Sequence, residues 1–131
     1  MQYEQGTPED WIIAESENYL IKGAYENVLL YSKADNKMIT CIGDFYGDPV
    51  DGIIDWNEQF CITVGCGYII YYLKKPFDSY IYHKETKQWI EAGRNSNCIK
   101  WIKKVRQLSD NEIELTDENN NIEIIKVLIS K

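Results

Sequence analysis

The sequence predicts an all-β fold, or a β-rich α+β fold with one short N-terminal helix. Short apolar segments rich in Tyr, Ile and Val alternate with turn-forming runs of Gly, Asn and Asp, a pattern typical of an antiparallel sandwich or barrel. Aromatic residues reach 13%, and rings favour strands. No long stretch has helical periodicity. The 131 residues fit a single domain, 1–131.

The N-terminal part leaves two interpretations open. Thr7-Pro8-Glu9-Asp10 resembles a helix start, because Thr can cap, Pro suits the first helical position, and acids suit the positive end of the helix dipole. The apolar run Trp11–Ile13 that follows is too short to establish a period. We therefore expect a short helix or a strand here.

The first clear hairpin pairs 27–32 with 37–42 around the polar link Lys33-Ala34-Asp35-Asn36. Gly43–Gly52 is dense in Gly, Asp and Pro and predicts a loop. Further strands are expected at 52–55 and 60–64, on either side of a turn at Trp56-Asn57-Glu58.

Gly65-Cys66-Gly67 predicts a tight turn or bulge, because glycine accepts positive φ. The next segment, Tyr68–Leu73, is apolar on both faces, which indicates a central strand that ends at Lys74-Lys75-Pro76.

The C-terminal half predicts a second hairpin and a meander. We expect 80–83 to pair with 88–91 around Lys84–Lys87, and a turn at Gly93–Asn97. The meander strands are expected at 98–108, 112–116 and 121–129, because polar turn-forming runs separate them.

The four cysteines, Cys41, Cys61, Cys66 and Cys98, are expected to be reduced thiols packed as small hydrophobes. Only Cys61 and Cys66 are close in sequence, which does not fit the paired spacing of a zinc site, so we expect no metal and no cofactor. No basic segment followed by an apolar run marks a signal peptide, and no apolar stretch is long enough for a membrane span. We therefore expect a cytoplasmic protein.

Negative charge is concentrated in the first half of the chain. Residues 1–65 carry three basic and twelve acidic side chains, a balance of −9, whereas residues 66–131 carry +2, which gives the net charge of −7. An acidic field repels nucleic acid and anionic membranes and attracts basic protein surfaces. The basic run Lys100, Lys103, Lys104 and Arg106 is interpreted as a solvated strand face.

The acidic segment from Asp44 to Glu58 is the candidate site. Its spacing lacks the alternation of an EF-hand, and nothing in it selects two carboxylates for glycoside hydrolysis. A turn whose Asp residues bond their own backbone would account for the pattern. The functional alternative is a contact surface for a basic partner, in which rings anchor and carboxylates steer. That surface would contain Asp44, Tyr46, Asp48, Asp51, Asp55, Trp56 and Glu58.

No enzyme signature stands out. His83 is the single histidine, and no known nucleophile motif surrounds a Cys or Ser. The glycines at 65 and 67 do not complete a phosphate-binding loop. Trp89 and Trp101 lie in strand patterns and are expected to pack in the core or across strands rather than to form a sugar-stacking platform.

The segment Cys41–Phe77, CIGDFYGDPVDGIIDWNEQFCITVGCGYIIYYLKKPF, resembles one kind of bacterial immunity protein from polymorphic-toxin and contact-dependent growth-inhibition systems. The resemblance lies in the Gly-Asp-Pro loop before an Asp-Trp turn, the acidic balance and the β-rich pattern. It implies a protein that binds and neutralises a cognate toxin in the same cytoplasm, often by covering its active site. Many such toxins are basic nucleases, whose phosphate groove an acidic surface can occupy.

Two hypotheses follow. The first is a non-catalytic inhibitor of the immunity type, whose partner is a protein toxin rather than nucleic acid or a membrane. The second is a small β module that binds a ligand or assembles, which predicts an apolar pocket or a symmetric interface with the acidic loop uninvolved. The sequence predicts no oligomeric state.

Overall fold

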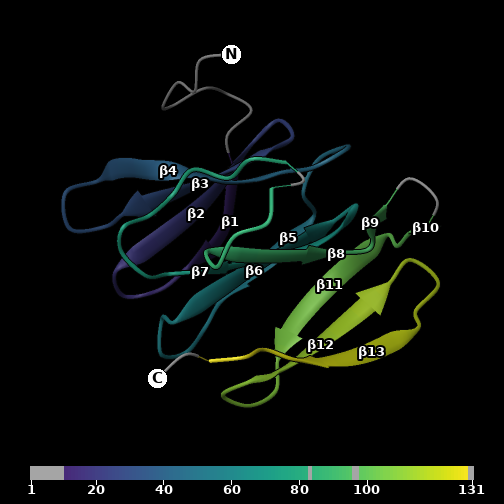
Figure 1. Ribbon diagram of the computed structural model, residues 1–131. Coiled ribbons are helices and arrows are strands. Elements are labelled where there is room, and N and C mark those ends of the chain that lie inside the picture. Colours follow the sequence, from purple (N-terminus) through teal and green to yellow (C-terminus); the bar gives the residue numbers. More distant parts are fainter. Residues whose placement is uncertain (1–10, 83, 96–97, 130–131) are drawn as a thin grey trace.

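A computed structural model describes residues 11–82, 84–95 and 98–129 (Figure 1). Over these residues the fold is all-β, with antiparallel strands and no helix. The all-β prediction is therefore confirmed. The expected helix start at Thr7–Asp10 lies outside the described residues, and Trp11–Ile13 belongs to a strand rather than to a helix.

Three sheets form three layers, from top to bottom of Figure 1. The first sheet has the order β1 (Trp11–Glu15), β2 (Tyr19–Ala24), β3 (Asn27–Ser32) and β4 (Lys37–Asp44). The middle sheet has the order β5 (Asp51–Ile54), β6 (Phe60–Gly65), β7 (Gly67–Tyr72) and β8 (Trp89–Ala92). The third sheet contains β11 (Ile102–Gln107), β12 (Glu112–Asp117) and β13 (Ile122–Lys126). A short ladder joins β9 (Arg94–Asn95) to β10 (Cys98–Ile99).

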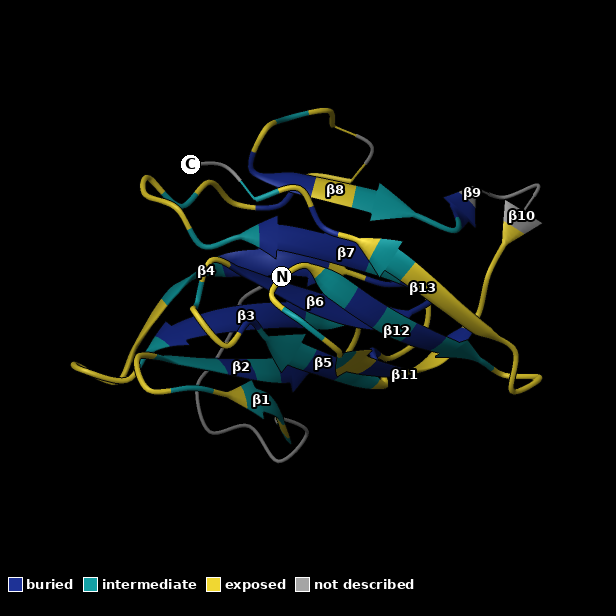
Figure 2. Ribbon diagram, turned by 90° about the horizontal axis from the view of Figure 1, so that it is seen from below, coloured by how far each residue is buried: buried dark blue, intermediate teal, exposed yellow. Residues whose placement is uncertain are grey.

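The middle sheet is buried on both faces, as Figure 2 shows for β6 and β7. Because side chains alternate along a strand, Cys61, Ile69 and Tyr71 pack against the first sheet, whereas Phe60, Ile62 and Ile70 pack against the third. This double burial explains why 60–64 and 68–73 are almost continuously apolar. The predicted central position of Tyr68–Leu73 is confirmed.

Several further predictions are confirmed. The hairpin of β3 and β4 turns at 33–36, and Gly65 pairs with Gly67 across the β6–β7 turn, where Gly67 has a φ of +76°. The meander β11-β12-β13 is present, and the basic run in and beside β11 is exposed to solvent. The predicted loop is shorter than expected, because β4 continues to Asp44 and β5 begins at Asp51. Strand β2 was not anticipated.

The second predicted hairpin is wrong. Residues 80–82 form no strand, and β8 pairs with β7 instead. Tyr80 is buried between the first and middle sheets, where its N–H donates to the Cys41 carbonyl at 2.9 Å. Trp89 stacks on Tyr71 with ring centroids 6.3 Å apart. Burying these aromatic side chains outweighs a local hairpin that would leave both at an edge.

Candidate binding surfaces

The first candidate surface lies beside the β6–β7 turn, on the loop that follows β4. Tyr46 is 74% exposed there, between the exposed carboxylates Asp44 and Asp48. Its ring lies 6.4 Å from that of Trp101, which is also exposed. We call Asp44, Tyr46, Asp48 and Trp101 the aromatic–acidic surface. Trp101 was expected to pack in the core or across strands, and of these two alternatives the core is excluded, because Trp101 is exposed and forms an isolated antiparallel bridge with Cys66.

The loop that carries this surface is tied to the fold on both sides. Between the exposed residues, Phe45 is buried, and its N–H donates to the Glu26 carbonyl at 2.8 Å. Gly47 has a φ of +83°, which glycine adopts without strain, and its N–H donates to Glu26 Oε2 at 2.6 Å. The loop therefore presents its exposed side chains in one conformation.

Arg94 holds the loop from beneath. This side chain is buried, and it donates from Nη1 to the Cys66 carbonyl at 2.9 Å and from Nη2 to the Asp44 carbonyl. Its guanidinium lies 4.6 Å from the Phe45 ring centre, and its Nε is 2.8 Å from Glu91 Oε1. One cation thus joins β4, the β6–β7 turn and β8, which is the planar, multidentate role that suits arginine.

Burial raises the pKa of two side chains around this anchor, Asp44 and Tyr80. Burial, together with repulsion from Glu26, raises the pKa of Asp44, although Arg94 opposes the shift. Tyr80 donates its hydroxyl to Glu91 at 2.6 Å, and burial with this hydrogen bond raises the pKa of Tyr80, so that it remains a donor at neutral pH. The Tyr80–Glu91–Arg94 chain is a buried polar network beneath the surface.

Three of the predicted carboxylates do not belong to this surface. Asp55 is only 1% exposed and accepts from the Gln59 N–H at 3.0 Å and from Gln107 Nε2 at 2.7 Å. Asp51 is partly buried and accepts from the Val105 N–H at 3.0 Å. Glu58 is also bound within the fold. Only the Asp55–Gln59 bond is the local turn contact that the sequence left open, whereas Asp51 and Glu58 accept from residues distant in the chain.

Glu58 connects the β5–β6 turn to the β1–β2 turn. It accepts from the Ser16 hydroxyl, from the Asn18 N–H at 2.9 Å and from Asn18 Nδ2 at 2.7 Å. Burial would raise the pKa of Glu58, but these hydrogen bonds, with Lys33 nearby, lower it. Its φ of +56° is left-handed, and the three bonds are what hold it there.

Trp56 is exposed, but it lies at the opposite end of β6 from Tyr46. Strand β6 runs from Phe60 beside the Asp55 turn to Gly65 beside the Asp48 loop. Six strand residues span roughly 17 Å. The structure therefore brings Asp44, Tyr46 and Asp48 together and separates Trp56 from them.

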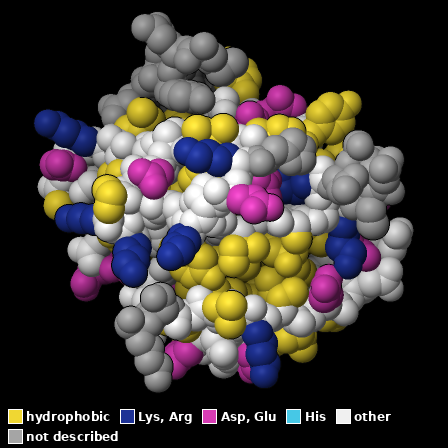
Figure 3. All heavy atoms as spheres, viewed as in Figure 1, with side chains coloured by type: hydrophobic (Ala, Val, Ile, Leu, Met, Phe, Trp, Pro, Cys, Tyr) yellow, Lys and Arg dark blue, Asp and Glu magenta, His cyan; other side chains and the backbone are white. Residues whose placement is uncertain are grey.

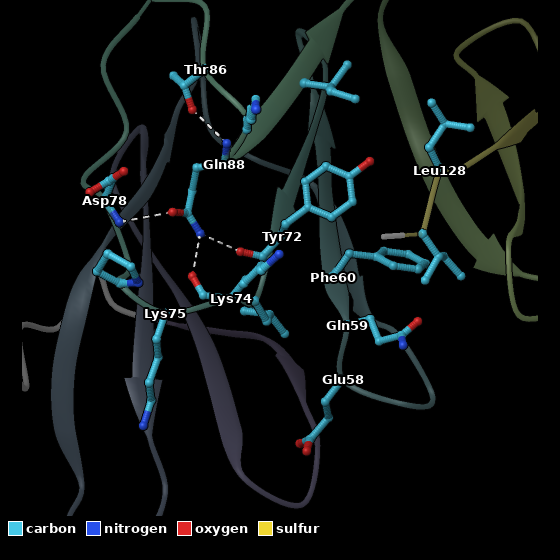
Figure 4. Close-up of a pocket in the computed structure, with 15 residues that line it drawn as sticks. Glu58, Gln59, Phe60, Tyr72, Lys74, Lys75, Asp78, Thr86, Gln88 and Leu128 are labelled. Atoms are coloured by element: carbon cyan, nitrogen blue, oxygen red, sulfur yellow. Dashed lines mark hydrogen bonds between the residues drawn. The ribbon is translucent and has the colours of Figure 1, made fainter. Parts of the chain in front are cut away.

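The second candidate surface is an apolar groove that sequence reasoning missed. It has a volume of about 880 Å³ and lies between the β7–β8 end of the middle sheet and the C-terminal segment 128–129 (Figure 4). Its apolar lining includes Phe60, Tyr72, Leu73, Pro76, Ile90, Leu128 and Ile129. One signal was available in the sequence, since Trp89-Ile90 places apolar side chains on both faces of a short strand.

The described residues contain buried cysteines but no cluster that could hold a metal ion. Cys41, Cys61 and Cys66 are buried, and burial raises the pKa of Cys61, which makes it a poor nucleophile. Within this part of the chain, no three His, Cys, Asp or Glu side chains gather to hold a metal. His83 lies outside the described residues.

No protein-family model matches the chain, and a search of curated proteins found no match. In the described part of the chain, no helix has the length and apolar character required to cross a membrane.

Proposed function

We propose that this protein is a non-catalytic inhibitor of the immunity type, which captures a cognate toxin, such as a basic nuclease, through the aromatic–acidic surface. The single observation that carries the proposal is the fixed, exposed loop of Asp44, Tyr46 and Asp48, held by the buried side chain of Arg94. The proposed partner is a protein toxin because residues 41–77 resemble immunity proteins, which bind toxins.

Three physical features support recognition of a basic protein. An exposed Tyr provides a large anchor whose burial by a partner is favourable at low entropic cost. Two flanking carboxylates, of which Asp44 lies near Glu26, on a chain of net charge −7, steer a positively charged partner toward it. Because the loop is already bonded to the sheets, ordering it costs little on binding.

The first experiment is co-expression with the protein domain encoded immediately upstream, scored by cell survival and by co-purification. Rescue of growth together with a stable complex supports the proposal. If the upstream domain is not toxic, or is toxic but neither bound nor neutralised, the protein is not its inhibitor.

The surface is tested by charge reversal at Asp44→Lys with Asp48→Lys. We expect the affinity for the toxin to fall by at least about a hundredfold, since like charges brought together at an interface cost several kcal/mol. A matched control is Glu17→Lys with Asp110→Lys, which changes the net charge equally at exposed acids elsewhere. An equal loss of affinity in both double variants would mean that only the net charge of the protein matters. No loss of affinity in either would mean that the toxin binds at another surface.

A further inference from the structure

The middle sheet faces the first sheet on one side and the third sheet on the other. At the β8 edge, the space toward the first sheet is covered, and the space toward the third sheet is open. Residues 73–82 run from β7 to the β4 edge, where the Tyr80 N–H donates to the Cys41 carbonyl, and residues 84–88 lead back to β8 (Figure 1). Phe77 of the same segment packs edge-on against Tyr19 at 6.2 Å. This segment covers the opening between the first and middle sheets. The equivalent opening between β8 and the end of the third sheet is the apolar groove.

The groove exposes side chains that the fold does not use. Ile90 projects from β8 with 44% of its surface exposed, and Leu128 is 79% exposed on the facing C-terminal segment. In Figure 4 the Tyr72 ring lies between these two elements, above Phe60. Figure 3 shows the hydrophobic side chains gathered on this face, below β8. Exposed apolar surface of this extent commonly marks a binding site.

Three lysines line the groove together with acidic, hydroxyl and amide side chains. These are Lys74, Lys75 and Lys87, and within the described residues none of their ammonium groups forms an ion pair. The lining also contains two acids, Glu58 and Asp78, and the hydrogen bonds that Glu58 accepts lower its pKa and keep it charged, so three lysines face two carboxylates. The charge offered to a ligand is therefore positive.

Gln88 closes the end of the groove without offering it a polar group. Its Nε2 donates to the carbonyls of Tyr72 and Lys74, at 2.7 and 3.0 Å, and its Oε1 accepts from the Asp78 N–H (Figure 4). With this amide satisfied, the lysines are the cationic groups in the lining that can hold an anionic head.

We propose that the groove binds a small amphiphilic anion, with a hydrocarbon or aromatic body against Tyr72, Ile90 and Leu128 and a carboxylate or sulfonate head beside the lysines. The volume of about 880 Å³ lies within the range of small-molecule sites. The apolar wall disfavours neutral sugars, and the cationic rim disfavours cations. This site is separate from the aromatic–acidic surface and does not depend on the proposed function.

The test titrates the full-length protein with dodecanoate, below its micelle concentration, by calorimetry and by displacement of the fluorescent anion anilinonaphthalene sulfonate. Dodecyl maltoside and dodecyltrimethylammonium provide neutral and cationic heads on the same chain. Saturable binding of dodecanoate, at least about tenfold tighter than either, supports the proposal. Absence of saturable dodecanoate binding overturns it.

Two pairs of variants locate the site. Ile90→Glu should weaken dodecanoate binding about tenfold or more, because it places a carboxylate in the groove. Ile124→Glu is its control, since Ile124 is 56% exposed and pairs with Glu114 on the outer face of the third sheet. Lys74→Glu with Lys87→Glu should weaken dodecanoate but not dodecyl maltoside, whereas Lys37→Glu with Lys104→Glu should change neither.

Circular dichroism and thermal unfolding confirm that each variant is folded. Equal weakening by the groove variants and their controls would overturn the assignment of the site. Sedimentation distinguishes another occupant, because a concentration-dependent dimer that Ile90→Glu abolishes would mean that the groove receives a second copy of the chain instead.

Discussion

Replacing Arg94 by Met should loosen the loop that carries the aromatic–acidic surface. Methionine keeps the length and apolar stem of the side chain but removes every donor. The carbonyls of Cys66 and Asp44 then lose their donor, and the Glu91 carboxylate loses its cation. Because Arg94 is buried and Glu91 nearly so, solvent replaces these partners poorly.

The expected cost in the free energy of unfolding is worked from these contacts. Removing one partner of a buried ion pair costs about 3–5 kcal/mol. Glu91 still accepts from the Tyr80 hydroxyl, which places the cost near the lower end, at about 3 kcal/mol. For a domain of this size the corresponding fall in Tm is roughly 10 °C.

Urea unfolding, followed by tryptophan fluorescence and by circular dichroism, measures this cost. Arg94→Lys is the matched control, which should lose about half as much, because one ammonium cannot replace the fork of the guanidinium. The double variant Glu91→Gln, Arg94→Met should cost less than the sum of its single changes, because the two side chains interact. A change below about 0.5 kcal/mol for Arg94→Met, the range of ordinary surface substitutions, would refute the anchor.

Three further predictions concern the acids and the glycine turn. Asp55→Ala should lower the free energy of unfolding by about 2 kcal/mol, because it removes the acceptor of Gln107 and of the Gln59 N–H. The affinity of the folded variant for the toxin should be unchanged. A loss of affinity without a loss of stability would mean that Asp55 contacts the toxin. The fold lowers the pKa of Glu58 from 4.5, so the stability that Glu58 contributes is present above pH 4.5 and is lost as the pH falls through the folded-state pKa. Glu58→Gln should therefore make the free energy of unfolding depend less on pH in acid. An unchanged dependence would contradict the stabilising role of the Glu58 carboxylate. Gly67→Ala should destabilise by about 2–3 kcal/mol in the same urea assay, because the new Cβ would lie 2.4 Å from the Ala92 carbonyl oxygen at positive φ; a stable variant would mean that the turn can rearrange.

The local parts of the fold could be predicted from the sequence because their causes are local. Turn residues at 33–36 and 65–67 mark hairpins, and the unbroken apolar run at 68–72 indicates a strand buried on both faces. The path of 80–91 could not be predicted from the sequence, because Tyr80 is held by Cys41 of the first sheet and Trp89 by Tyr71 of the middle sheet, both remote in sequence.

The sequence also predicted only part of the candidate site. The spacing of acids from Asp44 to Glu58 indicated a special segment, and three of its members, Asp44, Tyr46 and Asp48, are exposed side by side. Sequence spacing could not separate these from Asp55, because its partner Gln107 lies 52 residues away. The anchor Arg94 and the apolar groove gave almost no sequence signal, since each is assembled from segments far apart in the chain.

What the sequence by itself determined is the all-β class, the acidic balance and most turns, because these follow from backbone preference and from formal charge. Only the tertiary structure decided which acids face solvent and which tie sheets together, and that β8 and the C-terminal segment enclose an apolar groove. The physical reason is that burial and hydrogen bonding depend on which strands stack, and stacking in three layers is set by contacts between residues distant along the chain.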